Sequence, residues 1–230
     1  APSFREHGAQ IWRGVTLTEL FQFWGGDERG NDFSGPRGDF PVCIPVASQF
    51  PHADGAAYAF QCRNEDRCAV VVGGDGSTSK GDFYEALNIA GAWRLPVVFV
   101  ICDNAWAISV PRSEQSAAET LAQKAVAAGL PGEQVDGNDA IAVRDAVERA
   151  LARARAGEGA TLIEALTYRL SDHTTADDAS RYRDPESVSA HWKGEPLARL
   201  RAYLVDAGHW TKAKEEALLV ATRAEGDEAA

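Results

Sequence analysis

The sequence contains no methionine, even at position 1, and has few cysteines and a deficit of basic residues. The missing first methionine predicts that the chain lacks an N-terminal segment of its parent protein. Lys and Arg total 23 against 34 Asp and Glu, which gives a net charge of -11. This balance argues against a nucleic-acid partner, because such proteins usually carry a basic face. No apolar run reaches the length that spans a bilayer, so we expect no membrane partner.

The few cysteines do not form a metal-binding or redox pattern. None of them pairs as CxxC, and no histidines cluster with them, which argues against a zinc site of the usual spacing. Two lie within or at the ends of apolar runs. We therefore predict free, buried thiols in a cytoplasmic protein. The four are Cys43, Cys62, Cys68 and Cys102.

Two common nucleotide-binding motifs are also missing. The segment "GDGSTSKG" (74–81) lacks the GxxxxGK[ST] spacing of a nucleoside-triphosphate loop. No GxGxxG follows the first clear strand, which argues against a dinucleotide-binding fold of the ordinary kind.

What the sequence does contain is an alternation of strand-like and helix-like segments. Short, β-branched apolar runs are typical of strands that are covered on both faces. Strand–helix alternation of this kind predicts an α/β fold, a mostly parallel sheet with helices on both faces. The expected strands are 68–73, 95–102, 133–137 and 161–170, and the expected helices are 81–93, 119–129 and 138–157. Asn138 or Asp139 can cap the last of these helices.

We expect one domain over residues 1–230. Within it, 1–66 is predicted to be irregular and loop-rich, with a helix only in the second half of 45–63. Residues 67–170 form the strand–helix core, 171–186 form a polar loop, and 187–230 form C-terminal helices.

Polar residues follow two consecutive predicted strands. Asp75 comes after the first, and Asn104 comes after the second. In open parallel sheets ligands bind outside the carboxyl ends of the strands, so these two side chains can converge. Gly74 and Gly76 allow a sharp turn and close approach to a ligand. An acid between glycines at a strand end is often only a turn, but a carboxylate with an amide oxygen also suits Mg²⁺ beside a phosphate.

The residues around this pair resemble a known family. The chain is similar to the alpha subunit of the E1 component of 2-oxo acid dehydrogenase complexes, and most similar to the bacterial pyruvate dehydrogenase (acetyl-transferring) type. The resemblance extends from residue 3 to about residue 220. The motifs that carry it are "SFREHG" (3–8), "GDGSTSKGDFYEALNIAGAWRLPVVFV" (74–100), "NAWAISVPRSEQ" (104–115), "QVDGND" (134–139), "LIEALTYR" (162–169) and "DHTTADDASRYRD" (172–184).

The resemblance implies a thiamine-diphosphate-binding fold and assigns roles residue by residue. Mg²⁺ would be held by Asp75, the side chain of Asn104 and the carbonyl of Trp106. The other cofactor-binding positions are Phe4, Arg5, Ile44, Val46, Gly74, Gly76, Ser77 and His173. Gly76 and Ser77 would meet the diphosphate through backbone N–H groups, and Arg5 through its guanidinium.

Some positions depart from the family pattern. Phe4 and Trp106 stand where tyrosine is usual, and Asp103 stands where the family commonly has asparagine. We expect Asp103 not to be a metal ligand. His173 is the implied catalytic residue, although a loop this polar is usually only solvated. Arg169 and Arg183 are expected to be structural.

The resemblance implies thiamine-diphosphate-dependent oxidative decarboxylation of pyruvate and acetylation of a lipoyl group. The partners would be an E1 beta subunit in an α2β2 heterotetramer, the lipoyl domain of E2 and a 2-oxo acid. Two alternatives stay open at this point. One is a branched-chain 2-oxo acid or acetoin substrate, and the other is a non-catalytic remnant that serves only in assembly.

Overall fold

The structure is a computed structural model that describes residues 1–35 and 37–230, so Pro36 of the predicted irregular segment lies outside the described residues. The described chain divides into two compact units. The first comprises Ala1 and residues 43–196, and the second comprises residues 2–42 and 197–230. The prediction of one domain over 1–230 stays a prediction.

The first unit is built on a parallel four-stranded sheet in the order β1-β2-β6-β5. Its strands are β1 (Ala69–Gly74), β2 (Val97–Asp103), β5 (Gly132–Asp136) and β6 (Thr161–Leu166). All four predicted strands are present, which confirms the α/β fold class. β6 is shorter than predicted because the chain leaves the sheet after Leu166.

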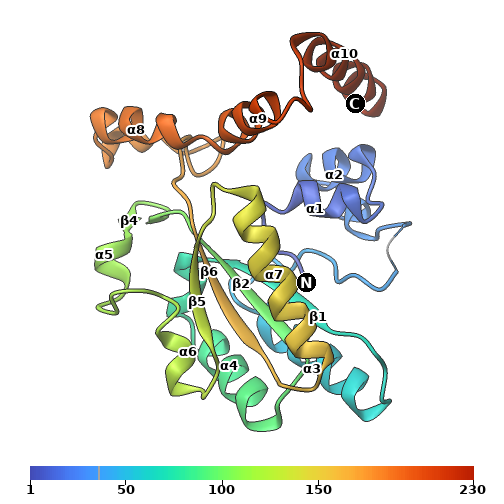
Figure 1. The fold of residues 1–230 in the computed structure, drawn as a ribbon, viewed down its shortest axis with the longest axis vertical. Coiled ribbons are helices and arrows are strands. Elements are labelled where there is room, and N and C mark those ends of the chain that lie inside the picture. Colours follow the sequence, from blue (N-terminus) through green and yellow to red (C-terminus); the bar gives the residue numbers. More distant parts are fainter. Residues whose placement is uncertain (36) are drawn as a thin grey trace. The chain divides into compact units, whose positions relative to one another are not determined.

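Helices cover both faces of this sheet (Figure 1). α7 (Ala140–Arg155) packs on one face, and α3 (Gln49–Cys62) and α4 (Gly81–Trp93) pack on the other. The central strand β2 alternates between the two layers. Phe99 faces the α3–α4 layer, whereas Val98 and Val100 belong to the cluster around α7. A strand covered on both sides needs apolar residues at every position, which explains the continuous apolar run.

α7 shows how the local sequence positions a helix. Asp139 Oδ1 accepts hydrogen bonds from the backbone N–H groups of Ile141 and Ala142, at 3.0 and 3.1 Å, so Asp139 rather than Asn138 is the cap. Gly157 follows the helix in the left-handed conformation, with φ of 73°. Buried alanines every four residues allow α7 to lie close to the sheet, namely Ala146, Ala150 and Ala154.

The remaining elements of the first unit are short. They are η2 (Asp75–Ser79), a β3–β4 hairpin (Trp106–Ala107 and Val110–Pro111), α5 (Arg112–Gln115), α6 (Lys124–Ala127), η3 (Ala179–Arg181), α8 (Pro185–His191) and η4 (Trp192–Gly194). The second unit contains α1 (His7–Trp12), α2 (Leu17–Trp24), η1 (Glu28–Asn31), all but the first residue of α9 (Pro196–Asp206), and α10 (Lys212–Ala229). Among the described residues, no helix combines the length and the apolar character needed to cross a membrane.

The predicted helix at 119–129 was largely wrong, because only α6 forms there. The backbone before α6 is bound in part by side chains. Arg112 donates to the carbonyls of Ser116 and Ala118, and Glu164 accepts from the N–H of Ala122. The contact from Glu164 to Ala122 spans 42 positions, and a long-range contact of this kind overrides the local helical pattern.

The helix predicted in the second half of 45–63 is confirmed as α3, which begins earlier, at Gln49. The rest of 1–66 was predicted to be irregular, and this was wrong for α1 and α2. α2 begins with a capping box, in which Thr16 and Glu19 bind each other's backbone N–H groups. This S/T-x-x-E signal was readable in the sequence. The cysteines are free as predicted, but they are not fully buried, and Cys62 at the end of α3 is exposed.

α3 carries an unusual buried acid. Asp54 is 4% exposed, and neither carboxylate oxygen has a hydrogen-bond partner among the described residues. Burial raises the pKa of Asp54 to about 8, because an unpaired charge is costly in an apolar environment. The neutral acid is therefore the form that suits the folded protein.

We expect Asp54 to make folding less favourable as the pH rises. An unfolded aspartate ionises near pH 4, so the folded state binds the extra proton between about pH 4 and pH 8. Over this window the free energy of unfolding should fall by about 1.4 kcal/mol per pH unit from this group alone. Urea denaturation at pH 5 and pH 8 measures how the free energy of unfolding changes with pH. In Asp54→Asn this decrease with rising pH should be smaller than in wild type by the contribution of Asp54. The matched control is Glu85→Gln on the exposed face of α4, and identical slopes for wild type and Asp54→Asn would contradict the expectation.

Candidate functional site

The carboxyl ends of β1 and β2 lie side by side in the sheet. Gly74, the last residue of β1, is in register with Cys102 near the end of β2. Asp75 and Asn104 therefore follow adjacent parallel strands and emerge at the same edge of the sheet. The two strand ends converge, as expected, because β1 and β2 are adjacent and parallel.

The turn after β1 comes very close to the hairpin after β2. A Cβ atom added to Gly76 would lie 2.8 Å from the Cβ of Ala107 in β3, which is too close for any side chain. Gly76 is therefore required by contact between the two turns. Gly74 has no such neighbour, since no described atom lies within 4 Å of its Cβ position.

Asp75 is deeply buried at this edge, with 2% of its surface exposed. Its Oδ2 accepts a hydrogen bond of 2.7 Å from Gln115 Nε2. Burial raises the pKa of Asp75, whereas Gln115, nearby backbone N–H groups and the charge of Arg112 oppose the rise. A buried carboxylate held mainly by neutral donors can be stabilised further by a cation.

The residues after Asp75 are anchored by a buried lysine. Thr78 Oγ1 donates to the carbonyl of Asp75 at 2.8 Å. Lys124 Nζ in turn donates to both the carbonyl and the Oγ1 of Thr78, each at 2.9 Å. Ser77 directs its hydroxyl back to the carbonyl of Gly74. Lys124 of α6 therefore holds the turn η2 in one conformation. The hydroxyls of Ser77 and Thr78 are engaged in hydrogen bonds within the turn.

The loop after β2 has an irregular backbone that carries two of the predicted ligand oxygens. Asn104 Oδ1 accepts from the N–H of Trp106 at 3.2 Å, and Ala105 and Ile108 have positive φ values of 69° and 56°. The Trp106 carbonyl accepts a 3.4 Å hydrogen bond from Arg169 Nη1. Each of these oxygens has a second lone pair that can accept another interaction.

The donor set is chemically suited to a hard cation. Among the described residues, no group of three His, Cys, Asp or Glu side chains is placed to hold a metal. A metal at this edge would therefore depend on one carboxylate together with amide and carbonyl oxygens. Mg²⁺ is held in this way, by few protein oxygens supplemented by phosphate and water. The residues at the two strand ends fit Mg²⁺ with a diphosphate.

Asp103 is occupied by structural contacts. It is 5% exposed, its Oδ1 accepts from the N–H of Ala105 at 3.0 Å, and its Oδ2 accepts from Arg112 Nε at 3.2 Å. Burial raises the pKa of Asp103 to about 6, and the neighbouring carboxyl of Glu164 adds to the rise. Asp103 thus shapes the loop that carries Asn104 and connects it to Arg112.

The polar loop at 171–186 is tied to the β3–β4 hairpin. Arg169 is 5% exposed and donates to the carbonyl of Ile108 at 2.8 Å and to Tyr182 Oη at 2.6 Å. Tyr182 donates to Asp177, whose Oδ2 also accepts from the N–H of His173 at 2.7 Å. A continuous series of hydrogen bonds therefore leads from the hairpin to His173.

Arg183 holds the other side of the same loop. Its guanidinium donates to the carbonyls of Arg169 and Ser171. Both buried arginines therefore order the loop by binding backbone carbonyls and Tyr182. This confirms their structural role, and it favours loop ordering over pairing with the many carboxylates of 172–184.

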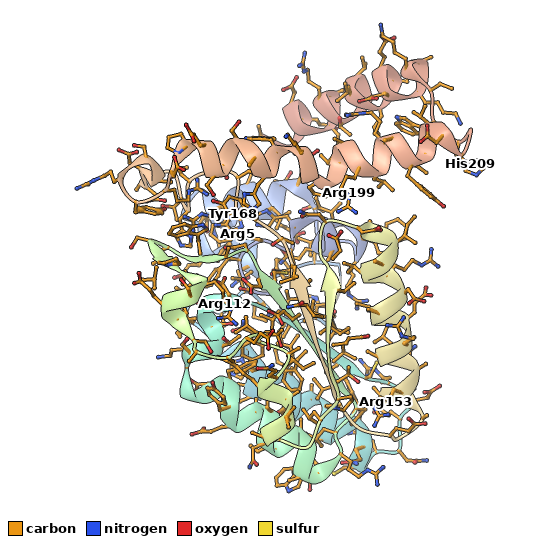
Figure 2. All side chains as sticks on the ribbon, turned by 60° about the vertical axis from the view of Figure 1, so that its left-hand side comes forward. Arg5, Arg112, Arg153, Tyr168, Arg199 and His209 are labelled. Carbon is orange, nitrogen blue, oxygen red and sulfur yellow. The ribbon has the colours of Figure 1, made fainter. Side chains whose placement is uncertain are left out.

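An open cavity of about 630 Å³ borders this region without coinciding with the strand ends. Trp106, Arg112, Tyr168 and Ser187 are among its lining residues, whereas Asp75 and Asn104 are not. Figure 2 labels two of these lining residues, Arg112 and Tyr168. It also labels Arg153, which lies away from them in the last turn of α7. Of the predicted site residues, only Trp106 contributes to the cavity wall.

The other predicted residues are more dispersed. Ile44 and Val46 belong to the first unit and are 58% and 46% exposed, just before the buried Ala47. Phe4 and Arg5 belong to the second unit. The cofactor contacts assigned to these four residues stay predictions.

Comparison with known proteins connects this geometry to a family. The dehydrogenase E1 component family matches residues 1–230, the whole sequence. The chain belongs to the dehydrogenase E1 component family. It is 45% identical over 225 residues to the pyruvate dehydrogenase E1 component subunit alpha of Staphylococcus aureus (strain Mu50 / ATCC 700699), covering 97% of this chain and 61% of the relative.

A second relative acts on a different substrate by name. The chain is 45% identical over 215 residues to the 3-methyl-2-oxobutanoate dehydrogenase subunit alpha of Mycobacterium tuberculosis (strain ATCC 25618 / H37Rv), covering 94% of this chain and 59% of the relative. The chain thus spans about three fifths of the length of these curated relatives. Equal identity to both leaves the substrate undecided by similarity alone.

Sequence reasoning missed several residues that organise the site of this E1 chain. Gln115, Arg112 and Lys124 all contact the turns that carry the predicted ligands. Gln115 and Arg112 lie in a motif that resembled the family, but spacing gave no sign of their contacts. The position of Gln115, at the end of a polar stretch after the second strand, was the one feature of the sequence that could have indicated a residue of the site.

We expect Arg169→Met to loosen the loop at 171–186 in this E1 chain. The substitution leaves the carbonyl of Ile108 and the hydroxyl of Tyr182 without their donor. The free energy of unfolding should fall by about 2–3 kcal/mol. Hydrogen–deuterium exchange should become faster in residues 171–184. Arg181→Met is the control, because Arg181 lies in the same loop and is exposed, and equal exchange in the two variants would refute the ordering role.

Proposed function

We propose that this chain is the alpha part of a thiamine-diphosphate-dependent 2-oxo acid dehydrogenase E1, with pyruvate as its substrate. The observation that carries the proposal is the oxygen set at the ends of β1 and β2, with a deeply buried Asp75 at its centre. The names of the relatives support the reaction class. The cytoplasmic location predicted from the cysteines is part of the same proposal.

The residues of this chain would bind and orient Mg²⁺ and thiamine diphosphate. Asp75, Asn104 Oδ1 and the Trp106 carbonyl would hold the cation, and the N–H groups of Gly76 and Ser77 would bind the diphosphate. Thiamine diphosphate supplies the nucleophile and the electron sink for decarboxylation. Arg5, with Phe4 beside it, would neutralise phosphate charge, and Ile44 and Val46 would contact the apolar part of the cofactor.

His173 would act at the mouth of the site. Its backbone is held by Asp177, and the arginine-linked loop fixes the segment around it. A histidine can hold or move a proton near neutral pH, which suits a residue beside the reacting groups. In this proposal the loop at 171–186 keeps His173 in position.

The partners belong to the same proposal. An E1 beta chain would complete the active site in an α2β2 heterotetramer, and the lipoyl domain of E2 would receive the acyl group. The branched-chain substrate is the second candidate, because the relative from M. tuberculosis is named for 3-methyl-2-oxobutanoate.

Removing the central carboxylate tests the metal assignment. Asp75→Ala should weaken Mg²⁺-dependent binding of thiamine diphosphate by more than about 100-fold, because the only carboxylate of the set is lost. Isothermal titration calorimetry on the complex with the beta chain measures this affinity. Asp82→Asn, an exposed acid seven positions further along the sequence, should bind like wild type. Unchanged affinity in Asp75→Ala would show that the assignment is wrong.

Substrate choice is measured by kcat/KM on the complex with the beta chain. The kcat/KM for pyruvate should exceed the kcat/KM for 3-methyl-2-oxobutanoate by about tenfold or more, because each misplaced methylene lowers kcat/KM roughly 10- to 200-fold. The reverse order would assign the branched-chain function. A complex that binds the cofactor but decarboxylates neither acid would indicate the non-catalytic alternative.

A further inference from the structure

Among the described residues, the side chain of Gln115 binds directly to the buried carboxylate of Asp75 from outside the turn η2. Its Nε2 lies 2.7 Å from Asp75 Oδ2 and 3.1 Å from the carbonyl of Val110. A carboxylate accepts hydrogen bonds and cannot donate them, so the amide must present its nitrogen on this side. One amide group therefore connects the end of β1 to strand β4 of the hairpin.

The backbone of Gln115 strengthens the same connection. Its carbonyl lies 3.5 Å from the hydroxyl of Ser79, at the end of η2. Gln115 thus contacts the turn after β1 through both its side chain and its main chain. The segment that carries it, α5, follows directly from the hairpin that contains Trp106.

The oxygen of the Gln115 amide, Oε1, is buried and has no hydrogen-bond partner among the described residues. Because Oε1 shares a carbon with the nitrogen that binds Asp75, this unpaired acceptor lies beside the buried carboxylate. A buried acceptor without a donor is costly, so an unpaired one in a native site needs an explanation. A hydrated Mg²⁺ retains water molecules that can donate to such an oxygen.

We infer that Gln115 is a positioning residue of the cation site, which holds Asp75 through Nε2 and accepts from a water of the hydrated ion through Oε1. With Oδ2 held by the amide, the carboxylate keeps a single orientation toward the ion. The inference rests on the function proposed above. It adds to that proposal a residue that touches neither the substrate nor the diphosphate.

The test is the affinity of the metal, measured apart from turnover. Mn²⁺ replaces Mg²⁺, and free Mn²⁺ is followed by electron paramagnetic resonance in the presence of thiamine diphosphate, on the complex with the beta chain. Gln115→Met keeps length and volume but removes both polar atoms. We expect Mn²⁺ to bind roughly 10- to 100-fold more weakly, as for other residues that orient metal ligands. Saturating Mn²⁺ should restore kcat.

Glu114→Gln is the matched control, since Glu114 is the exposed neighbour in the same helix, and it should bind Mn²⁺ like wild type. The unfolding midpoint in EDTA without cofactor should be the same for wild type and Gln115→Met. If the unfolding midpoint of Gln115→Met is lower than that of wild type, and the loss of folded protein explains the weaker binding of Mn²⁺, Gln115 has only a packing role and the inference is overturned. Should Gln115→Met not fold, Gln115→Ala is measured in its place.

Two further results are decisive. If wild type binds Mn²⁺ with thiamine diphosphate and Gln115→Met binds it equally well, the role of Gln115 is refuted while the proposed function stands. If wild type binds no Mn²⁺ in the presence of the cofactor, the proposed function fails and this inference fails with it.

Discussion

The parallel pairing of β1 with β2 is the constraint on which the candidate site depends. Because Gly74 is in register with Cys102, the two strands end at the same level of the sheet. The chain must then turn twice in a small space, and the close approach of Gly76 to Ala107 shows how little room is left. A shift of the register would separate Asp75 from Asn104, and the oxygen set would be lost.

Around these strand ends the fold buries many polar groups and pairs most of them. Lys124 binds Thr78, Arg112 binds Asp103, and Arg169 binds carbonyls of the hairpin and the 171–186 loop. Buried polar networks of this kind fix a single arrangement, because every broken contact leaves a costly unpaired group. Gln115 Oε1, by contrast, is a buried acceptor without a partner among the described residues. The Asp54 carboxyl also lacks a partner among them, but it lies in α3 and can be neutral by holding its proton.

Local patterns predicted the sheet of the first unit and the C-terminal helices α9 and α10 well, but they predicted the N-terminal part of the second unit poorly. The apolar runs at β1, β2 and β6 and the capped α7 were readable, because burial on both faces and helix capping leave direct marks on the sequence. The segment before Lys124 was predicted wrongly, because Glu164 binds its backbone from a distant position. α2 was overlooked although its capping box was visible, since glycine and proline nearby favoured an irregular prediction.

The sequence by itself determined the parallel α/β class, the positions of Asp75 and Asn104 after consecutive strands, and the family. These three conclusions depend on residue types and their spacing, which can be read directly from the sequence. Only the tertiary structure decided which side chains surround those positions. Gln115 reaches Asp75 and Lys124 reaches Thr78 because strand pairing and helix packing bring distant segments together. Such contacts arise from long-range packing, for which no local pattern in a single sequence is a sign.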